Sequence, residues 1–180
     1  MKSTAASDEP AAGLPLPRRP FAVSFLLVTA LLVASDLWTK CFMFDRFPPA
    51  HQVSSHPLLR NWLAVHTVWN TGIPWGVFSG RTSILAIVSA IAVVFIVWVF
   101  YRRSRNGNPL YCFGLALILG GAAGNLYDRA QLGAVRDWIE FVPRLPIIGQ
   151  WPIFNLADSG ICVGATMVFL AVSFGAEARK

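Results

Sequence analysis

The stretch ILAIVSAIAVVFIVWVFY, residues 84–101, decides the fold class. It carries no charged side chain, and Ser89 is its only hydroxyl before Tyr101. An α-helix needs about 17 to 25 predominantly apolar residues to cross the hydrocarbon core of a bilayer. The stretch is therefore predicted to form a transmembrane helix.

Three further stretches are long and apolar enough to extend the prediction to four spans. They are Phe21–Trp38, Leu110–Leu126 and Asn155–Ala176. An even number of spans returns both chain ends to the same side of the membrane. The sequence thus predicts an all-α membrane protein, with one four-helix transmembrane bundle over residues 20–176 and two long loops at 41–80 and 127–154.

The composition agrees with a membrane protein and argues against other classes. Of the 180 residues, 55% are hydrophobic and 13% are charged, whereas a soluble domain carries roughly 25% charged residues. Such an apolar chain is not disordered, and three scattered cysteines do not make a disulfide scaffold. The net charge of +6 flanks the apolar stretches instead of forming one basic patch, which argues against nucleic-acid binding.

The distribution of basic residues predicts the orientation, because cationic loops beside a span resist translocation. The N-terminal tail, the 102–109 loop and the C-terminal tail hold Lys2, Arg18, Arg19, Arg102, Arg103, Arg105, Arg179 and Lys180. The two longer loops mix basic with acidic side chains. Both termini are therefore expected in the cytoplasm, with residues 1–19 as a disordered tail and 177–180 as a short one.

A cleavable secretion signal is the alternative interpretation of the first span. Arg18 and Arg19 precede an apolar run that ends in the small residues Ala34 and Ser35, as in such signals. Cleavage would leave three spans and remove the charge asymmetry, so a retained span is favoured.

The two long loops show strand patterns. Residues 61–69 are dense in Trp, Val, Leu and Thr and end at Asn70-Thr-Gly72, which predicts a short strand running into a turn. Residues 134–141 alternate, with Asp137 on the apolar face and with Arg136 and Glu140 on the other face. A carboxylate on an apolar face is costly unless it is paired or functional.

Polar pairs gather at the outer ends of three predicted spans. The pairs are Asp36 with Lys40, Asn125 with Arg129, and Asn155 with Asp158. Members three or four residues apart share a helix face, and ionisable groups at membrane depth are candidates for a functional site. The alternative is that they are ordinary interfacial residues that reach water or cap helix ends.

Several reaction chemistries find no support in the sequence. No H-E-x-x-H is present, and the three histidines lie in one loop without the spacing of zinc ligands. No G-x-S-x-G marks a serine nucleophile, and Lys40 shares a helical face with Asp36, which keeps it protonated. Two of the cysteines lie within predicted spans. Two carboxylates remain as candidates, Asp137 and Asp158.

A pair of carboxylates at a partly desolvated site shares one proton and titrates as a unit. One member removes a proton from water while the other polarises the scissile carbonyl, which suffices for peptide hydrolysis. Amide side chains at 70, 125 and 155 offer donors and acceptors to an extended peptide. Arg129 either orients a carbonyl or forms a structural ion pair with Asp128 or Glu140.

Five motifs in this order resemble those of the lipoprotein signal peptidases, also called signal peptidase II. The motifs are Asp36-Leu-Trp-Thr-Lys40, Asn70-Thr-Gly72 with Phe78, Gly120-Gly-Ala-Ala-Gly124-Asn125-Leu-Tyr-Asp128-Arg129, Gly133-Ala-Val-Arg-Asp137-Trp-Ile139, and Phe154-Asn155-Leu-Ala-Asp158-Ser. Together, in this order and on this topology, they are highly specific. Two departures stand out: Ile73-Pro74-Trp75 follows the first glycine where the family usually has small residues, and Trp138 replaces a more common Phe.

The resemblance implies a membrane aspartyl endopeptidase that cleaves bacterial prolipoproteins just before the diacylglyceryl-modified cysteine. It implies Asp137 and Asp158 as the catalytic dyad, with no metal and no cofactor. Substrate-binding positions fall on Asn70, Gly72, Asn125, Arg129 and Asn155, and supporting positions on Asp36 and Lys40. It further implies a small extracytoplasmic β-cradle, a short lid helix over residues 72–78, membrane lipid and prolipoproteins as partners, and neither nucleic acid nor an obligate protein partner.

Two functions from other classes stay open at this point. In a small transporter, Asp36, Asp137 and Asp158 would relay ions, although nothing ionisable lies in the inner halves of the last three spans. A structural membrane protein would use small-residue helix contacts such as Gly120 with Gly124 and Gly160 with Gly164. That interpretation leaves the clustered carboxylates unexplained.

Overall fold

A computed structural model describes residues 19–49, 55–72, 80–103, 108–147 and 149–177. Its helices are α1 (Arg19–Arg46), α2 (Thr82–Arg103), α3 (Pro109–Leu132) and α4 (Leu156–Glu177), and its strands are β1 (His56–Leu59), β2 (Leu63–Asn70) and β3 (Val135–Phe141). All four helices are long and apolar enough to cross a membrane. The predicted four-helix membrane bundle is therefore confirmed.

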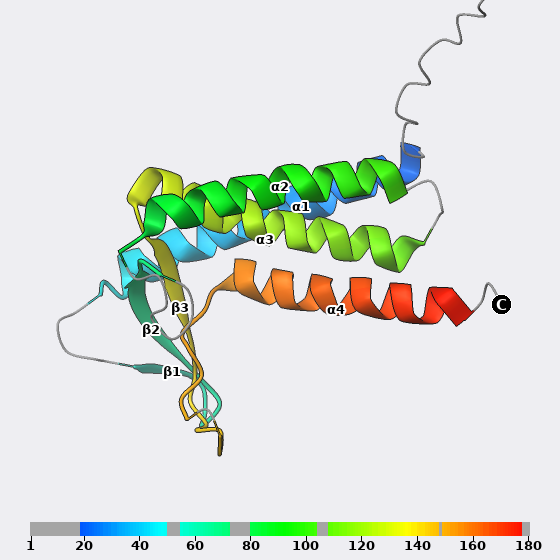
Figure 1. The fold of residues 1–180 in the computed structure, drawn as a ribbon. Coiled ribbons are helices and arrows are strands. Elements are labelled where there is room, and N and C mark those ends of the chain that lie inside the picture. The colour runs from blue at the N-terminus through cyan, green and yellow to red at the C-terminus, as the bar shows by residue number, and fades with distance from the viewer. Residues whose placement is uncertain (1–18, 50–54, 73–79, 104–107, 148, 178–180) are drawn as a thin grey trace, which may run out of the picture.

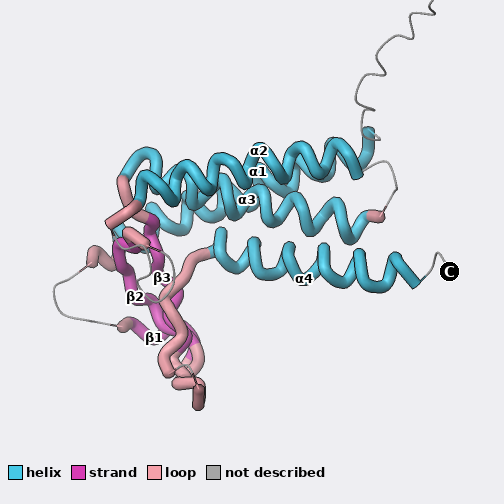
Figure 2. The backbone as a smooth tube through the Cα atoms, viewed as in Figure 1, coloured by secondary structure: helices cyan, strands magenta, loops and turns pink. Residues whose placement is uncertain are grey.

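The helices run side by side and the sheet lies across one end of them (Figures 1 and 2). Helix α1 begins and helix α4 ends at the other end of the bundle. Helix α3 is central, because it packs against α1, α2 and α4 and is the most buried of the four. Any site at the sheet end is thus supported by α3.

Three of the helices extend past the predicted apolar spans at the end that carries the sheet. Helix α1 continues to Arg46 rather than ending near Trp38, and α3 continues to Leu132 rather than Leu126. Helical hydrogen bonding does not require apolar side chains, so it proceeds until a stop signal. For α3 this signal is Gly133, whose φ of 73° is the left-handed cap that glycine adopts without strain. Helix α2 similarly begins at Thr82.

Close packing between helices depends on small residues at two places. A Cβ on Gly114 of α3 would lie 2.7 Å from the carbonyl oxygen of Gly164 on α4, so any side chain would push these helices apart. A Cβ on Gly124 would lie 2.5 Å from Asp36 Oδ2, so this glycine lets the α1 carboxylate reach α3. Gly160 faces Leu32 of α1 rather than another glycine. The small residues thus serve packing within this chain.

The sheet is antiparallel in the order β1-β2-β3. The strand predicted before Asn70 is present as β2, and its pairing with β3 places Val68 opposite Asp137 and Asn70 opposite Val135. This register brings the end of β2 beside the carboxylate of β3. The three strands form the small sheet that the resemblance implied.

The alternation of β3 assigns its side chains to two faces, and both faces are buried. The side chains of Arg136 and Glu140, on the face opposite Asp137, are as buried as their neighbours at 7% exposure each. The reason is that both faces of β3 are covered: Asp128 of α3 pairs with Arg136, and Gln150 donates to Glu140 Oε1 over 2.6 Å. Because both faces are buried, exposed and buried side chains do not alternate along this strand.

Three predicted segments lie wholly or mostly outside the described residues. They are residues 1–18 of the predicted N-terminal tail, residues 178–180 of the predicted C-terminal tail, and residues 73–79, which include nearly all of the implied lid helix with Pro74 and Trp75.

Candidate active site

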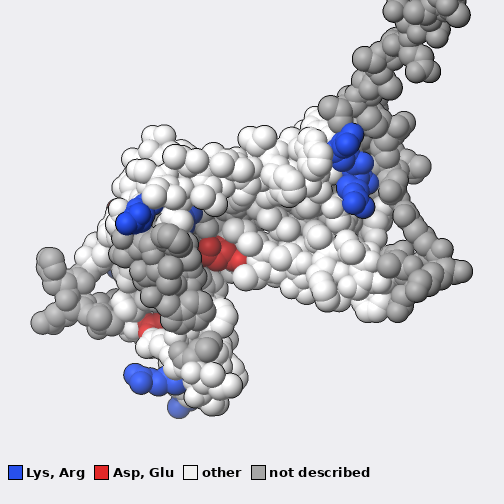
Figure 3. Space-filling model, viewed as in Figure 1, with Lys and Arg blue, Asp and Glu red and all other residues white. Residues whose placement is uncertain are grey.

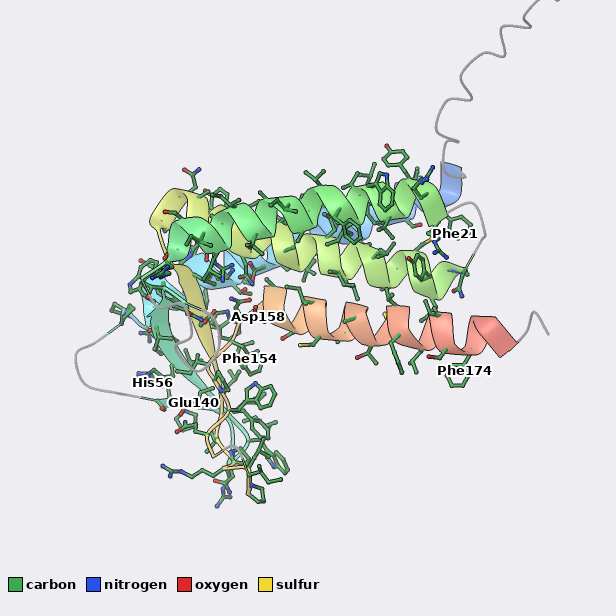
Figure 4. The ribbon with its side chains drawn as sticks, viewed as in Figure 1. Phe21, His56, Glu140, Phe154, Asp158 and Phe174 are labelled. Atoms are coloured by element: carbon green, nitrogen blue, oxygen red, sulfur yellow. The ribbon has the colours of Figure 1, made fainter. Side chains whose placement is uncertain are left out.

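A cavity of about 610 Å³ opens where the helices meet the sheet. Its lining includes Asn70 from the end of β2, Asp137 from β3, Asn125 and Arg129 from α3, and Asp158 from α4. Figure 4 shows Asp158 at the sheet end of α4, with Phe154 on the segment that leads into the helix. Figure 3 shows acidic atoms at the surface where the sheet region meets the bundle. Residues more than 80 positions apart in the chain thus converge on one cavity.

Asp137 is 2% exposed and accepts hydrogen bonds on both carboxylate oxygens. Asn155 Nδ2 donates to Oδ1 over 2.6 Å, and Asn70 Nδ2 donates to Oδ2 over 2.8 Å. Burial raises the pKa of this carboxyl from 3.8 to about 7, and the nearby charge of Asp158 adds to the rise. The amide donors oppose the shift without cancelling it. Asp137 therefore titrates close to neutral pH.

Asp158 sits in the first turn of α4 and is tied to Asn155, the residue that precedes the helix. Its backbone N–H donates to Asn155 Oδ1 over 3.0 Å, and the Asn155 backbone N–H donates back to Asp158 Oδ2 over 3.2 Å. This reciprocal cap fixes the carboxylate at the helix N-terminus, where a negative charge is favourable. Its other oxygen, Oδ1, accepts from Asn125 Nδ2 over 2.8 Å.

Asn155 and Asn125 connect the two carboxylates. Asn155 contacts both aspartates, and its Nδ2 also lies 3.1 Å from Asn125 Oδ1. Lys40 Nζ donates to the same Asn125 oxygen over 3.0 Å. Because a lysine ammonium is a donor only, it requires the oxygen of Asn125 on its side and so turns the NH₂ toward Asp158.

A fully buried ion cluster lies behind Asn125. Lys40 Nζ is 2.7 Å from Asp36 and 3.3 Å from Asp128, and all three side chains have 0% exposure. Arg136 donates to Asp128 from Nη2 over 2.7 Å, from Nε and from its backbone N–H. Asp36 also accepts from the Ala157 backbone N–H over 2.9 Å. The cluster therefore links α1, α3, β3 and the start of α4.

The structure thus brings the predicted site residues together in two layers. Asn70, Gly72, Asn125, Arg129, Asp137 and Asp158 line the cavity, Asn155 is buried between the carboxylates, and Asp36 and Lys40 lie behind Asn125. Gly72 supports Asn70 by donating its backbone N–H to Asn70 Oδ1 over 2.9 Å. The spacing of these residues in the sequence does not predict how close their side chains lie in the structure.

Arg129 does not form either ion pair suggested by the sequence. Asp128 pairs with Lys40 and Arg136, while Glu140 Oε2 lies 3.3 Å from His66 Nδ1. The Nε of Arg129 is buried and has no hydrogen-bond partner among the described residues. Arg129 itself is one of the residues that line the cavity.

Sequence reasoning missed Asp128 and Arg136 as parts of the site's support. Asp128 lies three residues after Asn125, and this spacing was a usable signal, because it places both on one face of α3. Arg136 had no such signal, since the alternation of the strand places it on the face opposite Asp137 and does not indicate its partner. Within the described ranges, no three side chains of His, Cys, Asp or Glu are placed to hold a metal ion.

The fold and the cavity together define an integral membrane protein that holds a buried pair of carboxylates where its helices meet its sheet. The profile of the family described as signal peptidase (SPase) II matches residues 28–174. The chain therefore belongs to the signal peptidase II family.

Individual relatives agree with this assignment. The lipoprotein signal peptidase of Oleidesulfovibrio alaskensis is 37% identical over 161 residues, which cover 86% of this chain and 97% of that protein. The lipoprotein signal peptidase of Syntrophotalea carbinolica is 36% identical over 154 residues, covering 81% of this chain and 88% of that protein. A bacterial membrane enzyme solved at 2.3 Å resolution is similar in structure, with a TM-score of 0.76, 26% identity and coverage of 87% and 92% of the two chains.

Proposed function

We propose that this chain is an aspartic endopeptidase that removes signal peptides from bacterial prolipoproteins, with Asp137 and Asp158 as its catalytic pair. The observation that carries the assignment of the pair is the amide bridge: Asn155 donates to Asp137 through Nδ2 and to Asp158 through its backbone N–H. Both carboxylates line one cavity. Membership of the signal peptidase II family supports the substrate class.

The pair is suited to activating water. Burial and mutual repulsion favour a state in which two carboxyl groups share one proton. In this state the ionised member accepts a proton from water, and the protonated member donates to the carbonyl oxygen of the scissile bond. The proton balance closes when the group that took the proton from water passes it to the leaving amine, while the other carboxylate takes back a proton from the gem-diol as the carbonyl re-forms.

The amide and guanidinium groups around the pair are suited to holding the peptide and the carboxylates. Asn70 and Asn125 each donate one N–H to a carboxylate and have further hydrogen-bonding capacity. The guanidinium of Arg129, a residue that lines the cavity, carries donors suited to a substrate carbonyl or to the oxyanion that forms from it.

We further propose that the substrate carries a diacylglyceryl group on the cysteine after the cleaved bond. The cavity wall on the α4 side is formed by Ile161, Cys162 and Val163, which belong to a membrane-spanning helix, and Trp151 and Pro152 continue it on the preceding segment. Acyl chains anchored in the bilayer would lie along this wall and hold the peptide bond at the level of the carboxylates.

The proposed orientation puts the carboxylate pair at the extracytoplasmic face. Helix α1 begins and helix α4 ends at the side of the bundle opposite the sheet (Figure 1), and eight of the fifteen basic residues lie in the three short segments predicted at that side, which favours the cytoplasm for it. A substrate delivered to the outer surface would then meet the cavity by lateral diffusion.

The requirement for the lipid is testable with one prolipoprotein prepared with and without the diacylglyceryl group. We expect kcat/KM in detergent to be roughly a hundredfold or more higher for the diacylated form, because the buried acyl chains contribute binding energy. Mass spectrometry of the products locates the cleaved bond. Equal rates for both substrates, or cleavage elsewhere, would contradict the proposed substrate.

The raised pKa of Asp137 predicts the alkaline limit of activity. Above about pH 7 the pair loses its shared proton, and the two negative charges can no longer donate to the scissile carbonyl. We expect kcat/KM to fall about tenfold per pH unit above that value, measured up to about pH 9 at constant ionic strength. Melting temperatures in the same buffers separate this loss from unfolding. A rate that stays flat or rises over this range would contradict the shared proton.

A further inference from the structure

A second cavity, of about 670 Å³, lies at the end of the bundle away from the sheet. Its lining comes mainly from α2 and α3, with Val168 contributed by α4. The apolar part of the lining includes Phe95 and Val99 of α2, Ile118 of α3 and Val168 of α4. The carboxylate pair and its supporting ion cluster contribute nothing to this lining.

The apolar part of this cavity suits hydrocarbon better than water. Its walls belong to helices that are long and apolar enough to cross a membrane, and Phe95 is 58% exposed on the outer surface of the bundle. A water molecule there would find few polar partners, and an apolar cleft does not hold ordered water without them. In a bilayer, an acyl chain is the component able to fill it.

Two guanidinium groups stand at one end of the same cavity. Arg102 and Arg103 are in the last turn of α2 and are both exposed. The ion pairs formed among the described residues include neither of them. The guanidinium of Arg102 lies 5.5 Å above the ring centroid of Trp98, and this cation–π contact holds the group against the bundle while leaving its N–H edges free.

We propose that this cavity binds one anionic phospholipid, with an acyl chain in the apolar cleft and the phosphate between Arg102 and Arg103. Guanidinium groups match phosphate oxygens with paired N–H donors, and basic pockets between membrane helices are suited to anionic head groups. Free inorganic phosphate would leave the apolar cleft empty, so the lipid is the ligand that satisfies both halves of the site. This site is independent of the proposed peptidase reaction.

The test is native mass spectrometry of the full chain in detergent with phosphatidylglycerol or with phosphatidylcholine of the same acyl chains. One phosphatidylglycerol is expected to stay bound under conditions that remove phosphatidylcholine. The double variant Arg102→Gln/Arg103→Gln is expected to hold it roughly thirtyfold more weakly, because each cation near an anionic head group adds to binding. The matched control is Arg60→Gln/Arg144→Gln, which removes two exposed cations at the sheet end and is expected to bind like the unaltered chain.

A third variant tests the cleft rather than the charges. Val99→Trp narrows the apolar part without changing the net charge, and it is expected to weaken retention of long-chain phosphatidylglycerol. Circular dichroism and melting temperature without added lipid show whether each variant folds. Equal loss in both double variants would mean unspecific attraction of charge, and equal binding of the two lipids, or full binding by Val99→Trp, would likewise overturn the proposed site.

Discussion

Replacing Asp137 or Asp158 singly by Asn is expected to lower the rate of prolipoprotein cleavage by roughly a thousandfold or more. An amide cannot accept the proton of water at neutral pH, and it cannot share one with the remaining carboxylate. Because the two groups act as a unit, the double variant is expected to be little slower than either single one. The measurement is single-turnover cleavage of a diacylated prolipoprotein in detergent micelles.

The matched control for this experiment is Asp45→Asn. Asp45 is an exposed carboxylate near the end of α1 at the same end of the bundle, outside the cavity lining. It should leave cleavage within about twofold of the unaltered chain. Melting temperatures of all variants verify that each one is folded. Substantial cleavage by a folded Asp137→Asn or Asp158→Asn variant would remove that residue from the catalytic pair.

The sequence predicts the spans well because one-dimensional patterns determine them. Residues 84–101 form a nearly continuous apolar stretch, which predicts a membrane-spanning helix, and α2 includes that stretch. The strand before Asn70 is likewise marked by its β-branched and aromatic residues and by the turn that follows. The polar pairs at one end of the spans also predict where the cavity lies, since spacing by three or four residues places partners on one helix face.

Contacts between elements are less accessible to such patterns. Periodicity shows that Lys40 and Asp36 share a face, but it does not show that Asp128 of α3 completes their cluster. The same limit applies to β3, where both faces are covered and the pairing of Arg136 with Asp128 depends on the path of α3. These contacts are set by how helices and strand meet in three dimensions.

Lys40→Met is expected to destabilise the protein by about 3–5 kcal/mol, since it removes one partner of a buried ion cluster. Methionine has a similar shape but no charge, so Asp36 loses its ion-pair partner and Asp128 keeps only Arg136. Folded molecules should also cleave more slowly, because the Asn125 amide loses the donor that turns its NH₂ toward Asp158. Unfolding by SDS in mixed micelles measures the free energy. The control Arg46→Met removes an exposed cation from the same helix and should change stability by less than about 0.5 kcal/mol.

A double-mutant cycle separates the loss of charge pairing from the loss of packing. Asp36→Asn added to Lys40→Met removes a carboxylate that would otherwise remain buried without its partner. The double variant is therefore expected to be more stable than Lys40→Met alone, with a coupling free energy of at least about 1 kcal/mol. Additive losses would mean that Lys40 contributes through its hydrocarbon chain rather than its charge. If Lys40 has a purely structural role, activity and stability should recover together in the double variant. If stability recovers but cleavage stays slow, Lys40 is a positioning residue that acts through Asn125.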